Sequence, residues 1–293
     1  MPLRGRDRTA VKGMISPTRV SALVSTPDPA ELGTLYRIGL AVQQVVRDSA
    51  GSPHRADVVA MGADGSPTEQ LDRQAEAAIL RAMDAEGVDW NLVSEEIGRV
   101  ERGGSRTLVV DPIDGTSNAI RRLPFSTVSL ALGDRDLSGV DIGLVRDLSR
   151  GRTYWGIRGR GAFLDGRRIR TRRWRPKGEV AFLNLGSNAT ERVVRLAGRA
   201  RRVRSLGCAS LEIAMVAEGG GDAYLFENVD EGRNLRATDI AAAYRILLEA
   251  GGGMTDAAGG SLEPFPLGVE KRTSVVAWGD PELGKALARD GSL

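Results

Sequence analysis

One stretch of this sequence, Thr107 to Asp114, most constrains what the chain can fold into. It opens with an apolar run typical of a buried strand, and Asp111 follows at the predicted end of that strand. Pro112 fixes its own backbone φ angle, so we expect a tight turn that leads to Asp114. In such a turn the carboxylates of Asp111 and Asp114 and the carbonyl oxygen of Ile113 can point at one place.

The residues after this turn predict the second half of the same site. Gly115 and Thr116 open a predicted helix, and the first N–H groups of a helix attract anions because they lack partners within it. Two carboxylates and a carbonyl oxygen suit a hard cation such as Mg²⁺, and the adjacent N–H groups suit a phosphate. The alternative for this segment alone is a strand–turn–helix junction in which Asp114 only caps the helix.

Three further acidic features favour the cation site. Glu95 and Glu96 follow Ser94 at the end of a second predicted strand, where adjacent carboxylates are costly unless water or a cation solvates them. Asp72 lies in the first turn of one predicted helix and Asp239 opens another. Each feature has a simpler explanation: a charged loop for the glutamates, and helix capping or stabilisation of the helix dipole for the aspartates.

The scarcity of histidine and cysteine excludes several kinds of site. The 293 residues include one histidine, His54, and one cysteine, Cys208, which are too few for a zinc cage or a disulfide framework. A Ser-His-Asp site would need His54, which lies in a turn-like Gly-Ser-Pro-His segment. Catalysis would therefore depend on carboxylates, hydroxyls, backbone groups or a bound cation. One free cysteine also fits a reducing compartment, so we expect a cytoplasmic protein.

The charge of the chain permits an anionic substrate without demonstrating one. The net charge is +3, with 41 basic and 38 acidic residues. Arg-rich segments at 167–175 and 199–204 suggest an RNA-binding protein as a non-enzymatic alternative. Alternation of charge within predicted strands favours a solvated sheet face instead, so we do not expect nucleic acid as a partner. No apolar run reaches the roughly 18–20 residues that span a bilayer, so we expect no membrane partner.

The predicted elements form two units after an N-terminal extension. Residues 1–29 lack a sustained period, and we expect them to be poorly ordered. We expect an α+β domain at 30–178 that carries most of the metal ligands, and an α/β domain at 179–293 that completes the site. Helices are predicted at 31–49, 68–84, 190–197, 210–218, 239–250 and after Asp280, and strands at 57–61, 91–94, 107–110, 125–132, 138–145, 152–157, 180–184, 201–205, 223–227 and 274–278, with a hairpin at 159–166.

Taken in order, these motifs resemble the inositol monophosphatase family of the Mg²⁺-dependent, lithium-sensitive sugar phosphatase superfamily. The resemblance covers about residues 31–290. Its motifs are Thr68-Glu-Gln-Leu-Asp72, Ser94-Glu-Glu96, Asp111-Pro-Ile-Asp-Gly-Thr116, and Thr238-Asp-Ile-Ala-Ala-Ala243 followed by Glu249-Ala-Gly-Gly252. The compact length, Gly62-Ala-Asp-Gly-Ser66 and Leu235-Arg-Ala-Thr-Asp239 are most similar to the archaeal-type enzymes that hydrolyse both inositol monophosphate and fructose 1,6-bisphosphate.

The resemblance implies a fold and a reaction. The fold would be a layered α-β-α-β-α sandwich of the α+β and α/β classes, and the protein a homodimer. The reaction would be hydrolysis of inositol 1-phosphate, fructose 1,6-bisphosphate or both, by in-line attack of a metal-activated water with inversion at phosphorus. Alternatives within the family are 3′-phosphoadenosine 5′-phosphate and histidinol phosphate, although the chain is compact for the nucleotide type.

The resemblance also implies a role for each matched acidic residue. Glu95, Asp111 and the carbonyl oxygen of Ile113 would hold a first Mg²⁺. Asp111, Asp114 and Asp239 would hold a second, and Glu95 would help with a weaker third ion. Two or three Mg²⁺ ions per site are therefore expected.

Further residues would bind the substrate or activate water. Gly115 and Thr116 would donate hydrogen bonds to the phosphate, and Asp72 with the Thr116 hydroxyl would orient and help to deprotonate the attacking water. Four matched residues would line the substrate: Asp114, Gly207, Cys208 and Ala209. The alternative for Cys208 is a buried thiol of the core.

The sequence departs from the family in one loop. Residues 227–235 form a longer segment than the short, often Arg-Pro-containing loop of archaeal-type relatives, which helps to select the leaving group. Arg233 and Arg236 could bind the distal phosphate of a bisphosphate, or they could be solvated loop residues. The additional residues leave the register of this loop open.

Overall fold

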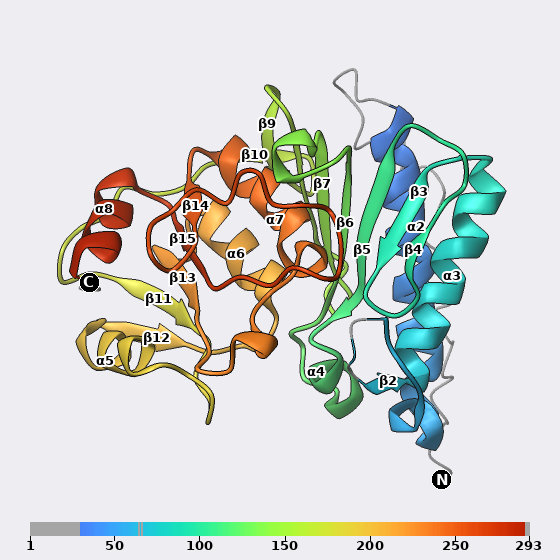
Figure 1. Cartoon of the computed structure of the whole chain (residues 1–293), viewed down its shortest axis with the longest axis horizontal. Coiled ribbons are helices and arrows are strands. Elements are labelled where there is room, and N and C mark those ends of the chain that lie inside the picture. The colour runs from blue at the N-terminus through green and yellow to red at the C-terminus, as the bar shows by residue number, and fades with distance from the viewer. Residues whose placement is uncertain (1–29, 64, 66, 291–293) are drawn as a thin grey trace, which may run out of the picture.

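Two sheets and three layers of helices alternate through the protein (Figure 1). The structure is a computed structural model that describes residues 30–63, 65 and 67–290. The layers follow the order helix, sheet, helix, sheet, helix, which confirms the predicted α-β-α-β-α sandwich. The prediction of a poorly ordered segment at 1–29 lies outside the described residues. Among the described residues, no helix is long and apolar enough to cross a membrane.

The larger sheet has eight strands in the order β10-β9-β8-β7-β6-β5-β3-β4. Its β3 and β5 are parallel neighbours, whereas its other pairs are antiparallel. Helices α2 (Ala30–Asp48) and α3 (Gln70–Glu86), on the right in Figure 1, cover its outer face. The strands are β3 (Asn91–Ser94), β4 (Gly98–Val100), β5 (Thr107–Asp114), β6 (Thr127–Gly133), β7 (Ile142–Asp147), β8 (Thr153–Ile157), β9 (Gly161–Leu164) and β10 (Arg167–Ile169).

The smaller sheet has five strands in the order β12-β11-β13-β15-β14. Helices α5 (Glu191–Arg199) and α8 (Pro281–Asp290) pack on its outer side, on the left in Figure 1. The strands are β11 (Val180–Leu183), β12 (Arg202–Arg204), β13 (Ala223–Phe226), β14 (Gly253–Thr255) and β15 (Val275–Trp278). The two sheets thus come from residues on either side of the boundary predicted near 178, and the division into domains remains a prediction.

Helices α6 (Ala209–Ala217) and α7 (Ala237–Ala250) form the middle layer between the two sheets (Figure 1). Small residues let α7 approach the larger sheet closely. A Cβ on Gly143 of β7 would lie 2.2 Å from the carbonyl oxygen of Ala242, and a Cβ on Gly156 of β8 would lie 2.9 Å from the Cα of Ile246. This close packing carries the first turns of α6 and α7 to the end of β5.

Strand β5 differs from its prediction in a way that shapes the site. The strand was expected to end at Val110, yet it continues to Asp114 and is buried along its whole length. The pairing with β6 shifts between Asp111 and Asp114, where three steps along β5 match two along β6. The segment is therefore a β-bulge rather than a turn after the strand, because Pro112 cannot donate a ladder hydrogen bond.

Two other elements begin later than predicted. Helix α3 starts at Gln70 because Pro67–Glu69 pairs as β2 with β1 (Val58–Met61) in a two-stranded hairpin. Strand β7 starts at Ile142 because Leu137–Gly139 forms a 3₁₀ turn. The carboxylate of Asp136 accepts the N–H groups of Ser138 and Gly139 and so caps that turn.

The contact of α7 with the larger sheet predicts a steric penalty at Gly143. We expect Gly143→Ala to lower the free energy of unfolding by about 1–3 kcal/mol, because the added methyl group must displace the α7 backbone. Gly198→Ala in α5 is the matched control: a Cβ there meets no atom within 4 Å, so the variant should be as stable as the wild type or more stable. Urea unfolding measures both, and equal midpoints for the two variants would contradict the close packing.

Candidate metal centre and active site

Three carboxylates from separate elements meet at the end of the larger sheet. Glu95 follows β3, Asp111 lies in β5, and Asp239 lies in the first turn of α7. One carboxylate oxygen from each lies within 4.8 Å of the others. The register of the parallel strands explains the first two positions. Ser94 pairs with Val110, and the residues that follow them, Glu95 and Asp111, are both acidic. We refer to Glu95, Asp111 and Asp239 as the acidic group.

The electrostatics of the acidic group favour a cation. Burial raises the pKa of Asp111 well above its usual range, and the charges of Glu95, Asp114 and Asp239 raise it further. The Oδ1 atom of Asp111 is buried and accepts no hydrogen bond from the described residues. A buried carboxylate oxygen without a donor is costly, and a divalent cation would remove that cost. Three carboxylates fit a hard cation such as Mg²⁺ rather than a thiophilic metal.

Asp239 both caps helix α7 and contributes a carboxylate oxygen to the acidic group. Helix α7 begins at Ala237, so Asp239 is its third residue rather than its first. Its Oδ2 atom accepts the backbone N–H of Arg236 at 2.6 Å, which caps the helix. Capping therefore fixes the side chain while Asp239 also contributes an oxygen to the acidic group.

Asp72 and Thr116 form a hydrogen-bonded pair beside the acidic group. The Oγ1 atom of Thr116 lies 3.0 Å from Oδ1 of Asp72 and 2.8 Å from the carbonyl oxygen of Ile113. Burial raises the pKa of Asp72 to about 8, and a hydrogen bond with Glu69 and the charge of Glu96 act in the same direction. Asp72 is thus able to hold a proton near neutral pH, as a proton acceptor for water must.

Asp114 faces α6 instead of joining the acidic group. Its Oδ1 accepts the N–H of Ala209 at 3.1 Å, and its Oδ2 accepts the N–H and the hydroxyl of Ser210, each at 2.6 Å. Burial raises the pKa of Asp114, and these hydrogen bonds oppose the rise. The predicted helix after Asp114 is present as α4 (Thr116–Arg121), with Gly115 as its N-cap. The role of Asp114 as a metal ligand remains a prediction.

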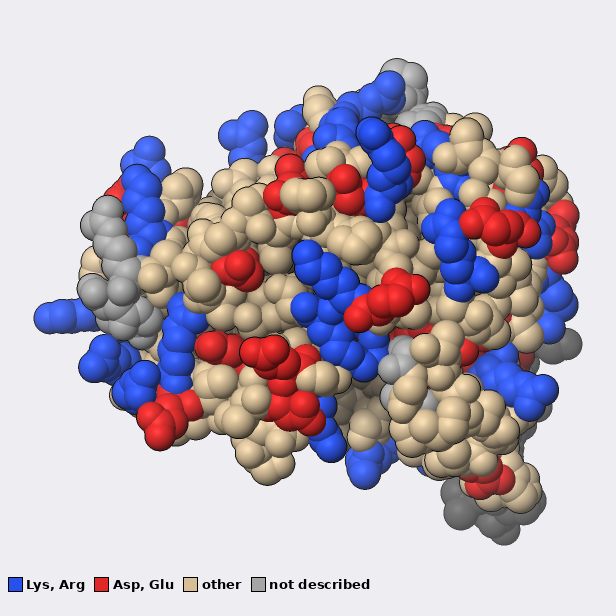
Figure 2. All heavy atoms as spheres, viewed as in Figure 1, with Lys and Arg blue, Asp and Glu red and all other residues tan. Residues whose placement is uncertain are grey.

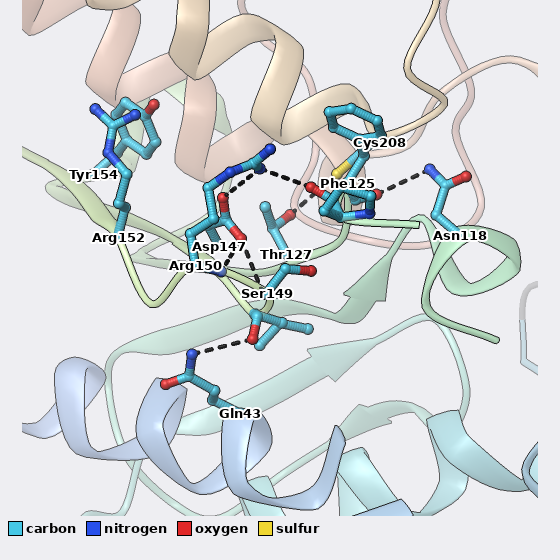
Figure 3. A network of polar contacts seen from close by, with 12 residues as sticks. Gln43, Asn118, Phe125, Thr127, Asp147, Ser149, Arg150, Arg152, Tyr154 and Cys208 are labelled. Carbon is cyan, nitrogen blue, oxygen red and sulfur yellow. Dashed lines mark hydrogen bonds and ion pairs between the residues drawn. The ribbon is translucent and has the colours of Figure 1, made fainter. Parts of the chain in front are cut away.

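The segment Gly207–Ala209 lies against the bulge of β5, and Figure 3 shows Cys208 beside Phe125 and Thr127. The sulfur of Cys208 is 3.3 Å from the carbonyl oxygen of Asp114 and 3.5 Å from Oγ1 of Thr127. Cys208 is buried, which raises its thiol pKa well above the usual range. A Cβ on Gly115, whose φ is +82°, would lie 2.7 Å from the carbonyl oxygen of Phe125 and 3.1 Å from that of Gly207. Glycine is therefore required at position 115.

The two loop arginines have different surroundings. Arg233 is largely exposed in a 3₁₀ turn (Glu231–Arg233) and forms an ion pair with Asp230 at 3.3 Å. Arg236 is buried and is the N-cap residue of α7. The side chain of Asn228 donates to the carbonyl oxygen of Arg233 at 2.8 Å, so the longer 227–235 loop has internal structure. A phosphate-binding role for either arginine remains a prediction.

Sequence reasoning missed the residues that support Asp114 and its neighbours. Ser210 of α6 donates to Asp114, and Thr127 of β6 contacts the Ser210 hydroxyl. Glu212, also in α6, accepts the N–H of Leu206 in the turn before that helix. A signal existed for Glu212, because it is the only charged residue in the otherwise apolar or small run of 209–217. A lone acidic residue on a buried helix needs hydrogen-bond donors, which are found here in the backbone that precedes the helix.

Three converging carboxylates, one of them buried, within an α-β-α-β-α sandwich define this protein as a candidate metal-dependent enzyme. The inositol monophosphatase family model matches residues 30–290. The chain therefore belongs to the inositol monophosphatase family, a metal-dependent family, and is a phosphoric monoester hydrolase.

Individual relatives agree with this family. The chain is 36% identical over 267 residues to a Methanothermobacter thermautotrophicus fructose-1,6-bisphosphatase/inositol-1-monophosphatase, covering 86% of this chain and 92% of that one. It is 30% identical to a Methanococcus maripaludis bifunctional NADP phosphatase/NAD kinase, covering 80% of this chain and 44% of that one. The fold is similar to that of a Pyrococcus horikoshii protein described as similar to inositol-1 monophosphatase, with a TM-score of 0.75, 28% identity and coverage of 89% and 97%.

Repulsion within the acidic group predicts that the stability of the metal-free protein falls as pH rises. The folded-state pKa of Asp111 lies above its ordinary value of 3.8, so its charged form destabilises the fold increasingly as pH rises from the unfolded pKa to the folded one. We expect Asp111→Asn to raise the thermal midpoint in EDTA by about 2–4 °C near pH 8, and by less near pH 5.

Asp136→Asn is the control with the opposite sign. Hydrogen bonds from Ser138 lower the pKa of Asp136, so its charge stabilises the fold at neutral pH and that contribution is lost as pH falls through the folded pKa. Its replacement should lower the midpoint near pH 8. A lower midpoint for Asp111→Asn as well would show that Asp111 is not under like-charge repulsion.

Proposed function

We propose that this protein is a Mg²⁺-dependent phosphomonoesterase that hydrolyses inositol 1-phosphate, fructose 1,6-bisphosphate or both. The observation that carries the proposal is the buried Oδ1 atom of Asp111, which accepts no hydrogen bond from the described residues and lies in the acidic group. The substrates are supported by the relative from Methanothermobacter thermautotrophicus, whose name gives both activities.

The chain offers a set of oxygen ligands for two or three Mg²⁺ ions. Glu95, Asp111 and Asp239 would hold the metal, together with the carbonyl oxygen of Ile113. Asp114 would join them by exchanging one of its contacts with α6. Bound Mg²⁺ supplies positive charge for the phosphoryl oxygens and the leaving alkoxide, and lowers the pKa of water.

The pair of Thr116 and Asp72 provides the route for the proton of the attacking water. The Thr116 hydroxyl has one proton, which it can donate to Oδ1 of Asp72 or to the carbonyl oxygen of Ile113. Its lone pairs are then free to accept a hydrogen bond from water and so orient it. Asp72, with its raised pKa, can accept the proton that the water loses.

The N-terminus of α4 would bind the phosphate. Gly115 and Thr116 open this helix next to the acidic group, and their backbone N–H groups would donate to phosphate oxygens. The turn Gly207–Ala209 would then contact the alcohol portion of the substrate from the other side. No phosphoenzyme is needed, because water is the nucleophile.

Other aspects of the proposal come from the family. A homodimer and a cytoplasmic location are expected. Nucleic acid is not expected as a partner, and Figure 2 shows basic side chains at several separate places on the visible face, with acidic side chains between them. A phosphate-tracking protein would instead need a continuous basic surface.

The test is phosphate release with Mg²⁺ from inositol 1-phosphate, fructose 1,6-bisphosphate, 3′-phosphoadenosine 5′-phosphate, histidinol phosphate and NADP. We expect the highest kcat/KM for the first two substrates. Asp111→Asn and Asp239→Asn should each lower kcat by about a thousandfold or more, because each removes a ligand that stabilises transition-state charge. Asp136→Asn should retain wild-type kcat.

Two results would contradict this proposal. Wild-type kcat in Asp111→Asn and Asp239→Asn would exclude the acidic group as the catalytic site. A higher kcat/KM for the nucleotides or histidinol phosphate than for both sugar phosphates would replace the substrate with one of the alternatives.

A further inference from the structure

The turn Leu206–Cys208 forms hydrogen bonds with side chains of two helices, α4 and α6. It lies directly before α6 and next to Gly115. Its carbonyl groups accept hydrogen bonds from one side chain and its N–H groups donate to another. These two side chains are Asn118 and Glu212.

Asn118 holds the carbonyl side of this turn. It is the third residue of α4, the helix that opens at Gly115. Its Nδ2 atom lies 2.7 Å from the carbonyl oxygen of Leu206, 3.3 Å from that of Gly207 and 2.9 Å from that of Phe125. Figure 3 shows this amide pointing from α4 toward the backbone of Phe125. One amide thus ties the phosphate-side helix to the turn.

Glu212 holds the N–H side of the turn. Its Oε1 atom accepts the N–H of Leu206 at 2.9 Å, and its Oε2 atom accepts the N–H of Cys208 at 3.4 Å. Glu212 is only 2% exposed, and burial raises its pKa to about 8 against the opposing effect of these backbone hydrogen bonds. A buried carboxyl group in an apolar helix is costly, which suggests a specific role for its position.

The position of this turn determines what lies beside the proposed substrate. Cys208 is the N-cap residue of α6, and the next two residues donate their N–H groups to Asp114. A Cβ on Gly115 would lie 3.1 Å from the carbonyl oxygen of Gly207, so the two backbone segments are in close contact. A shift of the turn would therefore move Gly207–Ala209 relative to α4 and change one side of the proposed substrate site.

We propose that Asn118 and Glu212 are positioning residues that together hold the turn Leu206–Cys208 in register with α4, so that Gly207–Ala209 binds the alcohol portion of the substrate. The proposal rests on the proposed function for the identity of the substrate. Neither residue touches the reacting atoms. Their effect is on the binding of inositol or sugar, and the chemistry at phosphorus depends on the acidic group and on Thr116.

Isosteric substitutions test this proposal without opening a cavity. Glu212→Gln replaces one acceptor oxygen with an amide that opposes a backbone N–H, and Asn118→Asp replaces the donor with an oxygen that opposes three carbonyl oxygens. We expect each to raise KM for inositol 1-phosphate by about tenfold while kcat changes by less than about threefold. For p-nitrophenyl phosphate, whose alcohol lacks the hydroxyls of a sugar, kcat and KM should stay within about twofold of wild type.

Amide hydrogen exchange gives a second measurement that does not depend on substrate. Peptides covering the turn should exchange faster in both variants than in the wild type. Glu212→Gln removes the acceptor of one N–H of the turn, and Asn118→Asp removes the donor that holds its carbonyl groups, so the turn opens more often. Glu218→Gln is the matched control: Glu218 caps the other end of α6 and binds Arg152 and Tyr154. It should leave both KM and exchange in the turn unchanged. If Asn118→Asp does not fold, Asn118→Ala replaces it.

The outcomes separate this proposal from the proposed function. Unchanged exchange in the turn would show that the two side chains do not hold it, whatever the substrate. Faster exchange with an unchanged KM, or an equal loss of kcat on both substrates, would show that the turn does not position the alcohol. Failure of the proposed function would instead appear as absence of sugar-phosphate turnover by the wild type, while the exchange measurement still tests the two contacts.

Discussion

Three carboxylates, of which Asp111 is buried and the other two are partly buried, meet at the end of the larger sheet, and their mutual repulsion governs the properties of the site. Glu95, Asp111 and Asp239 each carry a charge that the others oppose, and burial raises the pKa of Asp111 further. Such a group is unfavourable unless protons or a cation neutralise it. The fold nevertheless brings the three together from two parallel strands and a helix. The repulsion destabilises the metal-free fold. In the proposed function, Mg²⁺ would remove this repulsion on binding, which favours the bound state.

The middle layer of helices brings the remaining groups to this place. Glycines in β7 and β8 let α7 lie directly on the larger sheet, and its first turn carries Asp239 to the acidic group. The first turn of α6 meets Asp114 through the N–H groups of Ala209 and Ser210. Helix ends from one half of the chain thus complete a site whose strands come from the other half. This arrangement explains why the site lies at one end of the larger sheet, beside the first turns of α6 and α7.

Much of the fold and part of the site could be predicted from the sequence. The acidic residues after two predicted strands favoured a cation site, and the resemblance to the family implied that Glu95 and Asp111 share a metal. The parallel pairing of β3 and β5, which places these two residues side by side, is seen only in the structure. Local patterns could not show the bulge at Pro112, because it depends on pairing with β6. They also could not show that Asn118 reaches a turn about ninety residues away, since that contact needs the packed layers.

Calorimetric titration with Mg²⁺ tests the central claim, a cation site formed by the acidic group, most directly. We expect wild-type protein and Asp136→Asn to bind Mg²⁺ with equal affinity, because Asp136 caps a separate 3₁₀ turn. Asp111→Asn should bind at least about tenfold more weakly, a loss of about 1.4 kcal/mol or more. Equal affinity in Asp111→Asn would contradict the account, because the buried oxygen of Asp111 would then not hold the metal.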